Sequence, residues 1–314
     1  MPPAARTGTR RRAGSRPAGR QSAKQAKENP LALVEDITDI EITDLATAKF
    51  TKNILIYGPS GVGKTILAGG VTRRYKATFL STEPEGVVSA RNAGSTAGLM
   101  RAPTWEAAVS GVAKAEKALG ADDFLIVDSA DRMQVLYMRW ILEKENERNP
   151  MRDLDIPAIQ NYQKFQNGFL RWVDRIIDGP FNSIIITTSM SVEDAEGETR
   201  VIPHFRGTSK QPAEISDYIS AQASVGIYYA VARESVGATS GIIRRALAQP
   251  YPPYWAKDRF SALGRRWDVA ENEFFAMADM VTAIDKSLAE SGRENGATRS
   301  RRAGGASRSR LSDG

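Results

Sequence analysis

Eight consecutive residues, GPSGVGKT at 58–65, have the types and the spacing that bind a chain of phosphates. They match the pattern G-x-x-x-x-G-K-[ST], in which the glycines let successive backbone N–H groups point at phosphate oxygens. Lys64 would reach the terminal phosphates, and the Thr65 hydroxyl would be a ligand for Mg²⁺. The residues predicted to hold a nucleoside triphosphate are Gly58, Pro59, Ser60, Gly61, Val62, Gly63, Lys64 and Thr65.

The residues on either side of this stretch are those that such a loop requires. The apolar run NILIY at 53–57 predicts a strand before the loop, and ILAGGVTRRY at 66–75 predicts a helix after it. The partial positive charge at the start of that helix would add to the attraction for phosphate. The context therefore supports a phosphate-binding loop between a strand and a helix.

Two carboxylates also follow apolar runs. DFLIVDS at 123–129 predicts a strand that ends at Asp128, which would hold Mg²⁺ through water. FLSTEPEG at 79–86 places Glu83 after another such run, and hydrolysis of a triphosphate needs a base beside the terminal phosphate. We predict that Glu83 is this base; the alternatives are that Glu85 acts instead or that both are solvated loop acids.

Between residues 31 and 291, short apolar runs alternate with longer helical patterns. This alternation predicts an α/β fold, in which a mostly parallel sheet has helices on both faces and ends in an antiparallel extension. Strands are expected at 53–58, 77–82, 123–129, 182–189, 223–232 and 240–248. Helices are expected at 64–75, 104–119, 130–148, 157–178 and 271–289, with long irregular segments at 190–216 and 249–268.

The positive charge of the chain is concentrated at its two ends. The total is +6, while residues 1–30 carry +7 and residues 292–314 carry +4, so residues 31–291 carry −5. Both ends are rich in Gly, Ser and Arg and have few large apolar residues, so we expect them to be disordered basic tails. Their arginines could pair with nucleic-acid phosphates. The expected organisation is a tail at 1–30, a nucleotide-binding domain at 31–291 and a tail at 292–314.

Composition excludes several other classes of protein. The sequence has no cysteine, which excludes a disulfide framework and thiolate metal sites. No apolar run approaches the roughly 18 residues of a membrane span, and the N-terminus lacks the apolar stretch of a secretory signal. The N-terminus is Arg-rich as in transit peptides, but its prolines and glycines disfavour the amphipathic helix of such peptides. We expect an intracellular protein with no membrane contact.

Taken together, the motifs at residues 35–265 resemble those of RecA-like ATPases. Their order is a phosphate-binding loop (P-loop), a glutamate after the next strand, an aspartate after a second apolar strand, a polar strand end, a long loop and a Lys-x-Arg pair. The stretches 155–174 and 252–264 look similar to phage-encoded RecA-like proteins of the AAA family, of the single-strand annealing and recombination type. The resemblance implies a RecA-like P-loop core that uses ATP and Mg²⁺, with Lys64 and Glu83 in catalysis.

The resemblance also implies roles for residues later in the chain. The run NSIIITTS at 182–189 would end in a residue that senses the γ-phosphate, here Thr188 or Ser189, although the family usually has Gln or Asn there. Lys257 and Arg259 would share one face of an extended segment and reach the γ-phosphate site of a neighbouring subunit. The alternative for this pair is an ordinary surface charge cluster.

The segment 190–218 falls where recombinases have a loop that contacts DNA. It offers cations for phosphates and an aromatic ring for stacking on a base, namely Arg200, His204, Phe205, Arg206 and Lys210. Four acids in the same segment would repel DNA, namely Glu193, Asp194, Glu196 and Glu198. His204 is the only histidine, and the sequence gives it no partner cluster that would suggest a metal or triad role.

The implied function is a single-stranded-DNA-binding recombination or annealing ATPase, stimulated by DNA. It would assemble head-to-tail in a ring or filament and act in the cytoplasm, that of the host if the protein is phage-encoded. Single-stranded DNA, further copies of the chain and a single-strand-binding protein are the expected partners. The alternatives are a ring-forming replicative helicase motor, a DNA-packaging motor, a nucleotide-gated interaction protein with slow hydrolysis and a metabolic kinase.

Overall fold

The structure is a computed structural model of the chain, which divides into two compact units, Met1–Asp44 and Leu45–Gly314. The structure describes residues 43–45, 48–83, 85–151, 153–194, 196–207, 213–236, 239–269 and 274–306, with only the backbone at 233–236, 239–242 and 292–306. The tail expected at 1–30 and the end of the chain beyond Ala306 lie outside the described residues. No helix in these ranges is long and apolar enough to cross a membrane.

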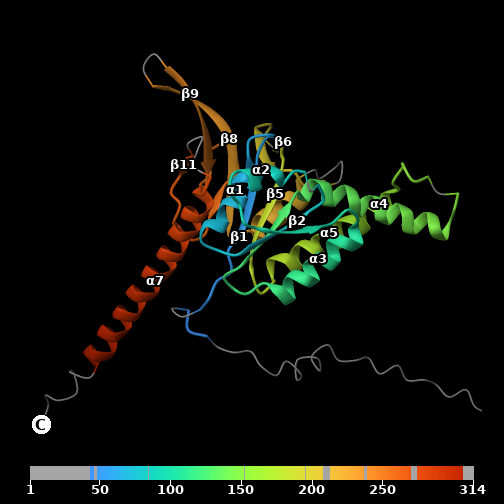
Figure 1. Ribbon diagram of the computed structural model, residues 1–314. Coiled ribbons are helices and arrows are strands. Elements are labelled where there is room, and N and C mark those ends of the chain that lie inside the picture. The colour runs from blue at the N-terminus through green and yellow to red at the C-terminus, as the bar shows by residue number, and fades with distance from the viewer. Residues whose placement is uncertain are drawn as a thin grey trace, which may run out of the picture. The chain divides into compact units, whose positions relative to one another are not determined.

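The second unit is built on one large mixed sheet (Figure 1). Its parallel part consists of β3 (Gly98–Arg101), β2 (Ala77–Ser81), β4 (Phe124–Asp128), β5 (Asn182–Thr187), β1 (Asn53–Tyr57) and β8 (Val225–Val236), in that spatial order. Antiparallel strands continue it, namely β9 (Thr239–Leu247), β11 (Arg266–Val269) and β10 (Lys257–Asp258), which pairs with β8. The predicted α/β class, mostly parallel sheet and antiparallel C-terminal extension are confirmed.

Helices cover both faces of this sheet, as predicted. One face carries α1 (Lys64–Gly69) with the 3₁₀ turn Gly70–Arg73, α2 (Val88–Asn92) and α7 (Ala276–Ala306). The other face carries α3 (Trp105–Ala118), α4 (Ala130–Arg148), α5 (Ile159–Ile177) and α6 (Glu214–Gln222). The central strands read as continuous apolar runs because successive side chains enter opposite cores; Ile54 and Ile56 face one core, and Leu55 faces the other.

An aromatic cluster fixes α3, α4 and α5 to each other. Trp105 stacks on Tyr137 with ring centroids 4.2 Å apart, and Phe165 stacks on Phe169 at 5.6 Å. The large apolar side chains of α5 at Phe165, Phe169, Trp172 and Ile176 are buried, and each such side chain stabilises the fold by about 1.5–3 kcal/mol. Ile159, the first residue of the same helix, is 83% exposed.

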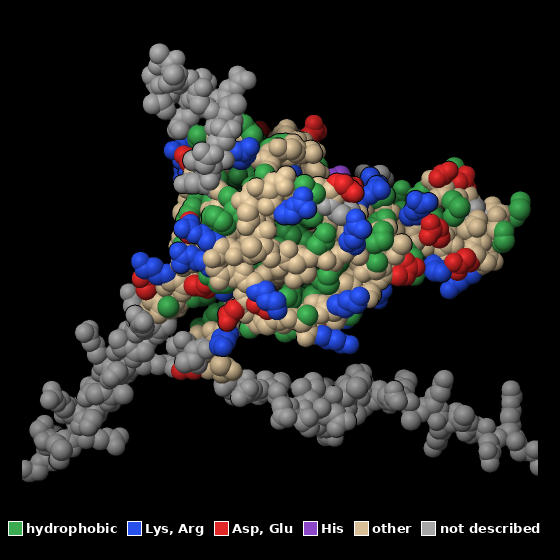
Figure 2. Space-filling model, in the orientation of Figure 1, with side chains coloured by type: hydrophobic (Ala, Val, Ile, Leu, Met, Phe, Trp, Pro, Cys, Tyr) green, Lys and Arg blue, Asp and Glu red, His purple; other side chains and the backbone are tan. Residues whose placement is uncertain are grey.

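The connection between α4 and α5 forms a projecting tip with exposed apolar side chains, visible at the right of Figure 2. The exposed residues there include Met151, Leu154, Ile156 and Ile159.

The segments expected to be irregular contain regular structure. A separate hairpin, β6 (Ser189–Glu193) with β7 (Thr199–Pro203), and α6 occupy most of 190–222, and β10 and β11 lie within 249–269. Two short elements, α2 and β3, were not expected at all. At the C-terminal end, α7 continues to Ala306, so the boundary expected at residue 292 falls inside a helix.

Candidate nucleotide-binding site

Because β1, β2, β4 and β5 are parallel, their carboxyl ends meet at one edge of the sheet, where ligands bind in folds of this kind. The loop 58–63 leaves β1 at this edge and leads into α1. Gly58 has φ 152°, and a Cβ there would lie 2.0 Å from the carbonyl oxygen of Tyr229, so only glycine fits. Gly61 and Gly63 also have positive φ, as a loop that curls around phosphates requires.

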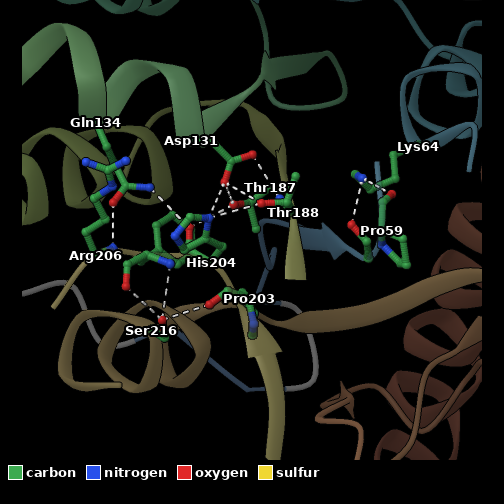
Figure 3. Close-up of polar contacts among 12 residues, drawn as sticks. Pro59, Lys64, Asp131, Gln134, Thr187, Thr188, Pro203, His204, Arg206 and Ser216 are labelled. Carbon is green, nitrogen blue, oxygen red and sulfur yellow. Dashed lines mark hydrogen bonds and ion pairs between the residues drawn. The ribbon is translucent and has the colours of Figure 1, made fainter. Parts of the chain in front are cut away.

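Lys64 points into this loop. Its Nζ donates hydrogen bonds to the carbonyl oxygens of Gly58 at 2.8 Å and Pro59 at 2.7 Å (Figure 3). Burial lowers the pKa of the ammonium, while the charges of Asp131 and Asp128 oppose this shift. The carbonyls thus hold a buried cation in the loop, where a phosphate would be a stronger partner.

Thr65 and Asp128 lie side by side at the ends of α1 and β4. The Thr65 hydroxyl donates to Oδ2 of Asp128 at 2.8 Å. Burial raises the pKa of the Asp128 carboxyl, and the bond from Thr65 and the charge of Lys64 act in the opposite direction. A hydroxyl and a carboxylate oxygen are the donors that Mg²⁺ takes together with water and phosphate oxygens, so this pair fits the ion that P-loop ATPases usually bind.

Glu83 lies at the same edge, just after β2. Its charge is close enough to Asp128 to raise the pKa of that carboxyl, although burial has the larger effect. The Glu83 side chain is 67% exposed, and its Oε1 lies 3.7 Å from Nε of Arg132 in the first turn of α4. The short turn that directs it is fixed by the buried Ser81 hydroxyl, which donates to the Glu83 carbonyl and accepts from the Glu83 N–H.

These groups surround a cleft of about 350 Å³. The predicted residues that line it are Ser60, Gly61, Gly63, Lys64, Thr65, Glu83, Asp128 and Thr188. Of the two residues considered as a γ-phosphate sensor, Thr188 faces the cleft, whereas Ser189 begins β6 and pairs with Pro203. Lys257 and Arg259 do not line the cleft either.

Asp131, which sequence reasoning missed, organises one wall of this cleft (Figure 3). Its Oδ1 accepts from the hydroxyls of Thr187 at 2.7 Å and Thr188 at 3.1 Å, and its Oδ2 accepts from the Thr188 backbone N–H at 2.9 Å. Burial raises the pKa of the Asp131 carboxyl, but the bonds from His204, Thr187 and Thr188 outweigh it, so the pKa lies below its ordinary value. Asp131 is therefore a positioning group and a poor base.

The same wall extends to the segment after β7. His204 Nδ1 lies 3.5 Å from Oδ1 of Asp131 and 3.1 Å from the Thr188 hydroxyl. One turn along α4, the Gln134 side chain donates to the His204 carbonyl at 3.1 Å and accepts from the Arg206 N–H at 2.7 Å. The sequence shows no partners for His204, whereas in the structure residues distant in sequence converge on it.

The segment differs from expectation at a second position. Phe205 was considered as an aromatic that stacks on a nucleic-acid base, but its side chain is fully buried in the core beneath α4 and α5. It therefore cannot stack on a base. Arg206 is exposed, Arg200 pairs with Asp217 at 3.3 Å, and Lys210 lies outside the described residues.

Lys257 and Arg259 do lie together, as their spacing predicts. Lys257 Nζ donates to the carbonyl oxygens of Ser220 at 3.1 Å and Ala221 at 2.7 Å, and Nη2 of Arg259 donates to the Ala221 carbonyl as well. These are orphan carbonyls at the end of α6, where cations are favourable. Within one chain, the pair thus caps a helix.

A signal for Asp131 and Gln134 exists in the sequence. They are three residues apart on the face of α4 that also buries Ala130, Met133 and Tyr137, and polar side chains on such a face need partners. His204 carries no comparable signal.

The comparison with protein families agrees with the phosphate-binding loop. A family model described as an AAA domain matches residues 51–260. No curated protein matched the sequence. Among solved structures, the flagellar accessory protein FlaH from Methanocaldococcus jannaschii is similar at 15% identity over 64% of this chain and 78% of that chain. Its TM-score of 0.29 adds nothing to the topology already described.

The matched region includes the P-loop, both carboxylates that follow strands and the Lys-x-Arg pair, and it spans more than half of the residues. With a P-loop between a strand and a helix at the carboxyl edge of a parallel sheet, the chain belongs to the AAA domain family of P-loop ATPases.

Proposed function

We propose that this protein is an ATPase that binds single-stranded DNA, assembles head-to-tail and acts in recombination or strand annealing. The observation that carries the proposal is the continuous polar wall from the cleft to the segment after β7. Asp131 and Thr188 line the cleft, Thr188 and Asp131 contact His204, and Gln134 holds the backbone at His204 and Arg206. In this proposal, a change in the cleft moves the surface segment that follows β7.

In this proposal, Lys64 exchanges its two carbonyl partners for β- and γ-phosphate oxygens. Glu83 accepts a proton from the attacking water, because it lines the cleft, its side chain is 67% exposed, and the nearest cation, Arg132, is 3.7 Å away. Thr188 is held by Asp131 with its hydroxyl near the position of the γ-phosphate. Mg²⁺, when held by Thr65 and Asp128, would neutralise charge on the phosphates.

The DNA side of the proposal rests on charge. The half-exposed Arg200 lies in β7, the exposed Arg206 follows that strand, and Arg200 can exchange Asp217 for a phosphate. Acids on the hairpin, among them Glu193 and Asp194, would keep DNA away from its tip. The basic residues at 1–30 and 292–314 would add sequence-independent attraction.

Assembly would bring Lys257 and Arg259 to the cleft of a neighbour. Their hydrogen bonds to the end of α6 are made to uncharged carbonyls, and a γ-phosphate is the stronger partner. A cation supplied by a neighbour would stabilise charge in the transition state and couple hydrolysis to assembly. The runner-up functions, a ring-forming helicase motor and a nucleotide-gated interaction protein, share the cleft but differ in what they require of DNA and of turnover.

The deciding experiment is ATP turnover by the full chain with and without single-stranded DNA, at low and moderate salt. We expect stimulation by DNA that weakens as salt rises, because contacts with phosphates release counterions. An ATP turnover rate that is the same with and without DNA would contradict the recombination assignment and favour a protein partner. Duplex unwinding in the same preparation would favour the helicase motor.

A further inference from the structure

Arg244 on β9 contacts the P-loop from outside the cleft. Its Nε donates to the carbonyl oxygen of Val62 at 3.1 Å, and a Cβ added to Gly63 would lie 3.3 Å from the same nitrogen. Arg244 and Ala246 are two residues apart on β9, so their side chains lie on the same face of the sheet. Ala246 packs in the core on the face that α1 covers, and Arg244 therefore lies on that face too. It also lies near the buried Tyr229: burial raises the pKa of Tyr229 to about 12, and the charge of Arg244 opposes that rise.

The sheet order indicates which end of a nucleotide comes to this side. Glu83 and Thr188 follow β2 and β5, and Asp128 is the last residue of β4. These three strands lie on one side of β1, whereas β8 and β9 lie on the other. Hydrolysis needs the γ-phosphate beside Glu83. The nucleoside end of the triphosphate must then leave the P-loop away from Glu83, on the side of β8 and β9.

The chemistry of Arg244 suits that position. Among the described residues, no carboxylate forms an ion pair with it, whereas the next residue, Arg245, faces the other way and pairs with Asp268 at 2.7 Å. A guanidinium is planar, is weakly hydrated and stacks on aromatic faces. With Nε held by Val62, the outer nitrogens remain available to a ring that lies beside Gly63.

We propose that Arg244 binds the nucleoside part of the bound nucleotide by stacking its guanidinium on the base. This inference rests on the proposed function only for the presence of ATP in the cleft. It makes Arg244 a binding residue that distinguishes a nucleotide from a bare triphosphate. Stacking contacts the flat face of the base and not the polar groups at its edge. Arg244 therefore raises the affinity for nucleotides without discriminating among bases.

The test is a calorimetric comparison of ATP and inorganic triphosphate as ligands of the full chain, in Mg²⁺ at fixed salt. Arg244→Met should weaken ATP binding roughly 3- to 30-fold, which corresponds to a cation–π contact, and leave inorganic triphosphate within about twofold. Arg244→Lys, which keeps a cation that can bond to Val62, should lose much of the ATP affinity too, since it lacks the planar group. Arg245→Met is the matched control and should change neither affinity.

Equal losses for ATP and inorganic triphosphate would overturn the inference, because Arg244 would then only support the P-loop. Unchanged ATP affinity in Arg244→Met would overturn it as well. So would a wild-type chain that binds ATP no more tightly than inorganic triphosphate. None of these readouts involves DNA, so a selective loss of ATP would support the role of Arg244 even if turnover proved indifferent to DNA.

Discussion

The backbone N–H of Thr188 donates to Oδ2 of Asp131 at 2.9 Å, and the hydroxyl of the same threonine donates to Oδ1 at 3.1 Å. The end of β5 is thus clamped to the first turn of α4 at the edge of the cleft. The clamp fixes Thr188 at the wall of the cleft, where the proposed function expects the γ-phosphate. The Thr188 hydroxyl also contacts Nδ1 of His204, so the clamp is connected to the segment after β7.

Replacing Asp131 tests the strength of this clamp. Asp131→Asn should lower the free energy of unfolding at pH 7 by about 1.5–3 kcal/mol, since it removes charge from bonds that a largely buried carboxylate accepts. Because the folded pKa is lowered, the contribution is complete above the ordinary value of 3.8 and is lost as the pH falls through the folded pKa. Urea unfolding at pH 7 and at acidic pH measures both effects.

Asp217→Asn is the matched control for that experiment. Asp217 is 53% exposed and pairs with a half-exposed Arg200, and such surface pairs contribute about 0–1 kcal/mol. Equal losses in the two variants would contradict a special role for the clamp.

Lys64→Ala should abolish tight binding of ATP, because the buried ammonium is the cation that the loop holds for phosphates. The expected loss of affinity is at least about tenfold, the value for one charge-assisted hydrogen bond. Calorimetric titration with ATP and Mg²⁺ measures it, with Lys76→Ala as an exposed lysine control. An affinity equal to that of the wild-type chain would contradict the assignment of the P-loop.

Glu83→Gln should keep ATP binding and lose turnover by roughly 100-fold or more, since the amide cannot take the proton from water. Steady-state phosphate release together with an ATP-binding curve separates the two effects. Glu85→Gln is the natural control, because Glu85 is the other acid of the same turn and does not line the cleft. If Glu85→Gln alone stops turnover, the base is Glu85.

Arg259→Ala should lose turnover but regain part of it in mixtures with Lys64→Ala. In such mixtures, an intact P-loop of one subunit can meet an intact Arg259 of another, and the two variants together complete one site. Phosphate release as a function of mixing ratio measures this recovery. Because Arg259 also caps α6, a melting curve of the variant must show an intact fold. Absence of recovery at every ratio would argue against a cation supplied by a neighbour.

Gly58→Ala should damage the P-loop more than Gly61→Ala. A Cβ at Gly58 would lie 2.0 Å from the backbone oxygen of Tyr229, so β1 and β8 would have to separate. Gly61 has no heavy atom within 4 Å of its added Cβ, and its cost is the strain of a positive φ, about 1–3 kcal/mol. Both the melting temperature and the ATP affinity should fall further in Gly58→Ala than in Gly61→Ala. A smaller loss for Gly58→Ala would contradict the close contact between the two strands.

The sequence predicted the long elements well and the short ones poorly. Strands such as β1, β4 and β5 are apolar on both faces, and α4 and α5 repeat apolar residues every three to four positions, so local pattern alone reveals them. By contrast, β3 is a mostly exposed edge strand, and the hairpin β6–β7 alternates only weakly. Their pairing depends on neighbours that are distant in the chain. In α6, the buried Ile215 and Ile219 are four residues apart, so the sequence does carry a helical signal there.

By itself, the sequence determined the P-loop, Asp128 and Glu83 as residues of one edge of a parallel sheet, because each lies at the end of a recognisable strand or just after it. Only the tertiary structure decided that Asp131, Thr188 and His204 meet, that Phe205 is buried and that Arg244 contacts Val62. The physical reason is that a motif is local, whereas a hydrogen-bond network depends on which strands are neighbours. The order of the strands depends on how both cores pack, and many segments contribute to that packing, so no single segment of the sequence reveals it.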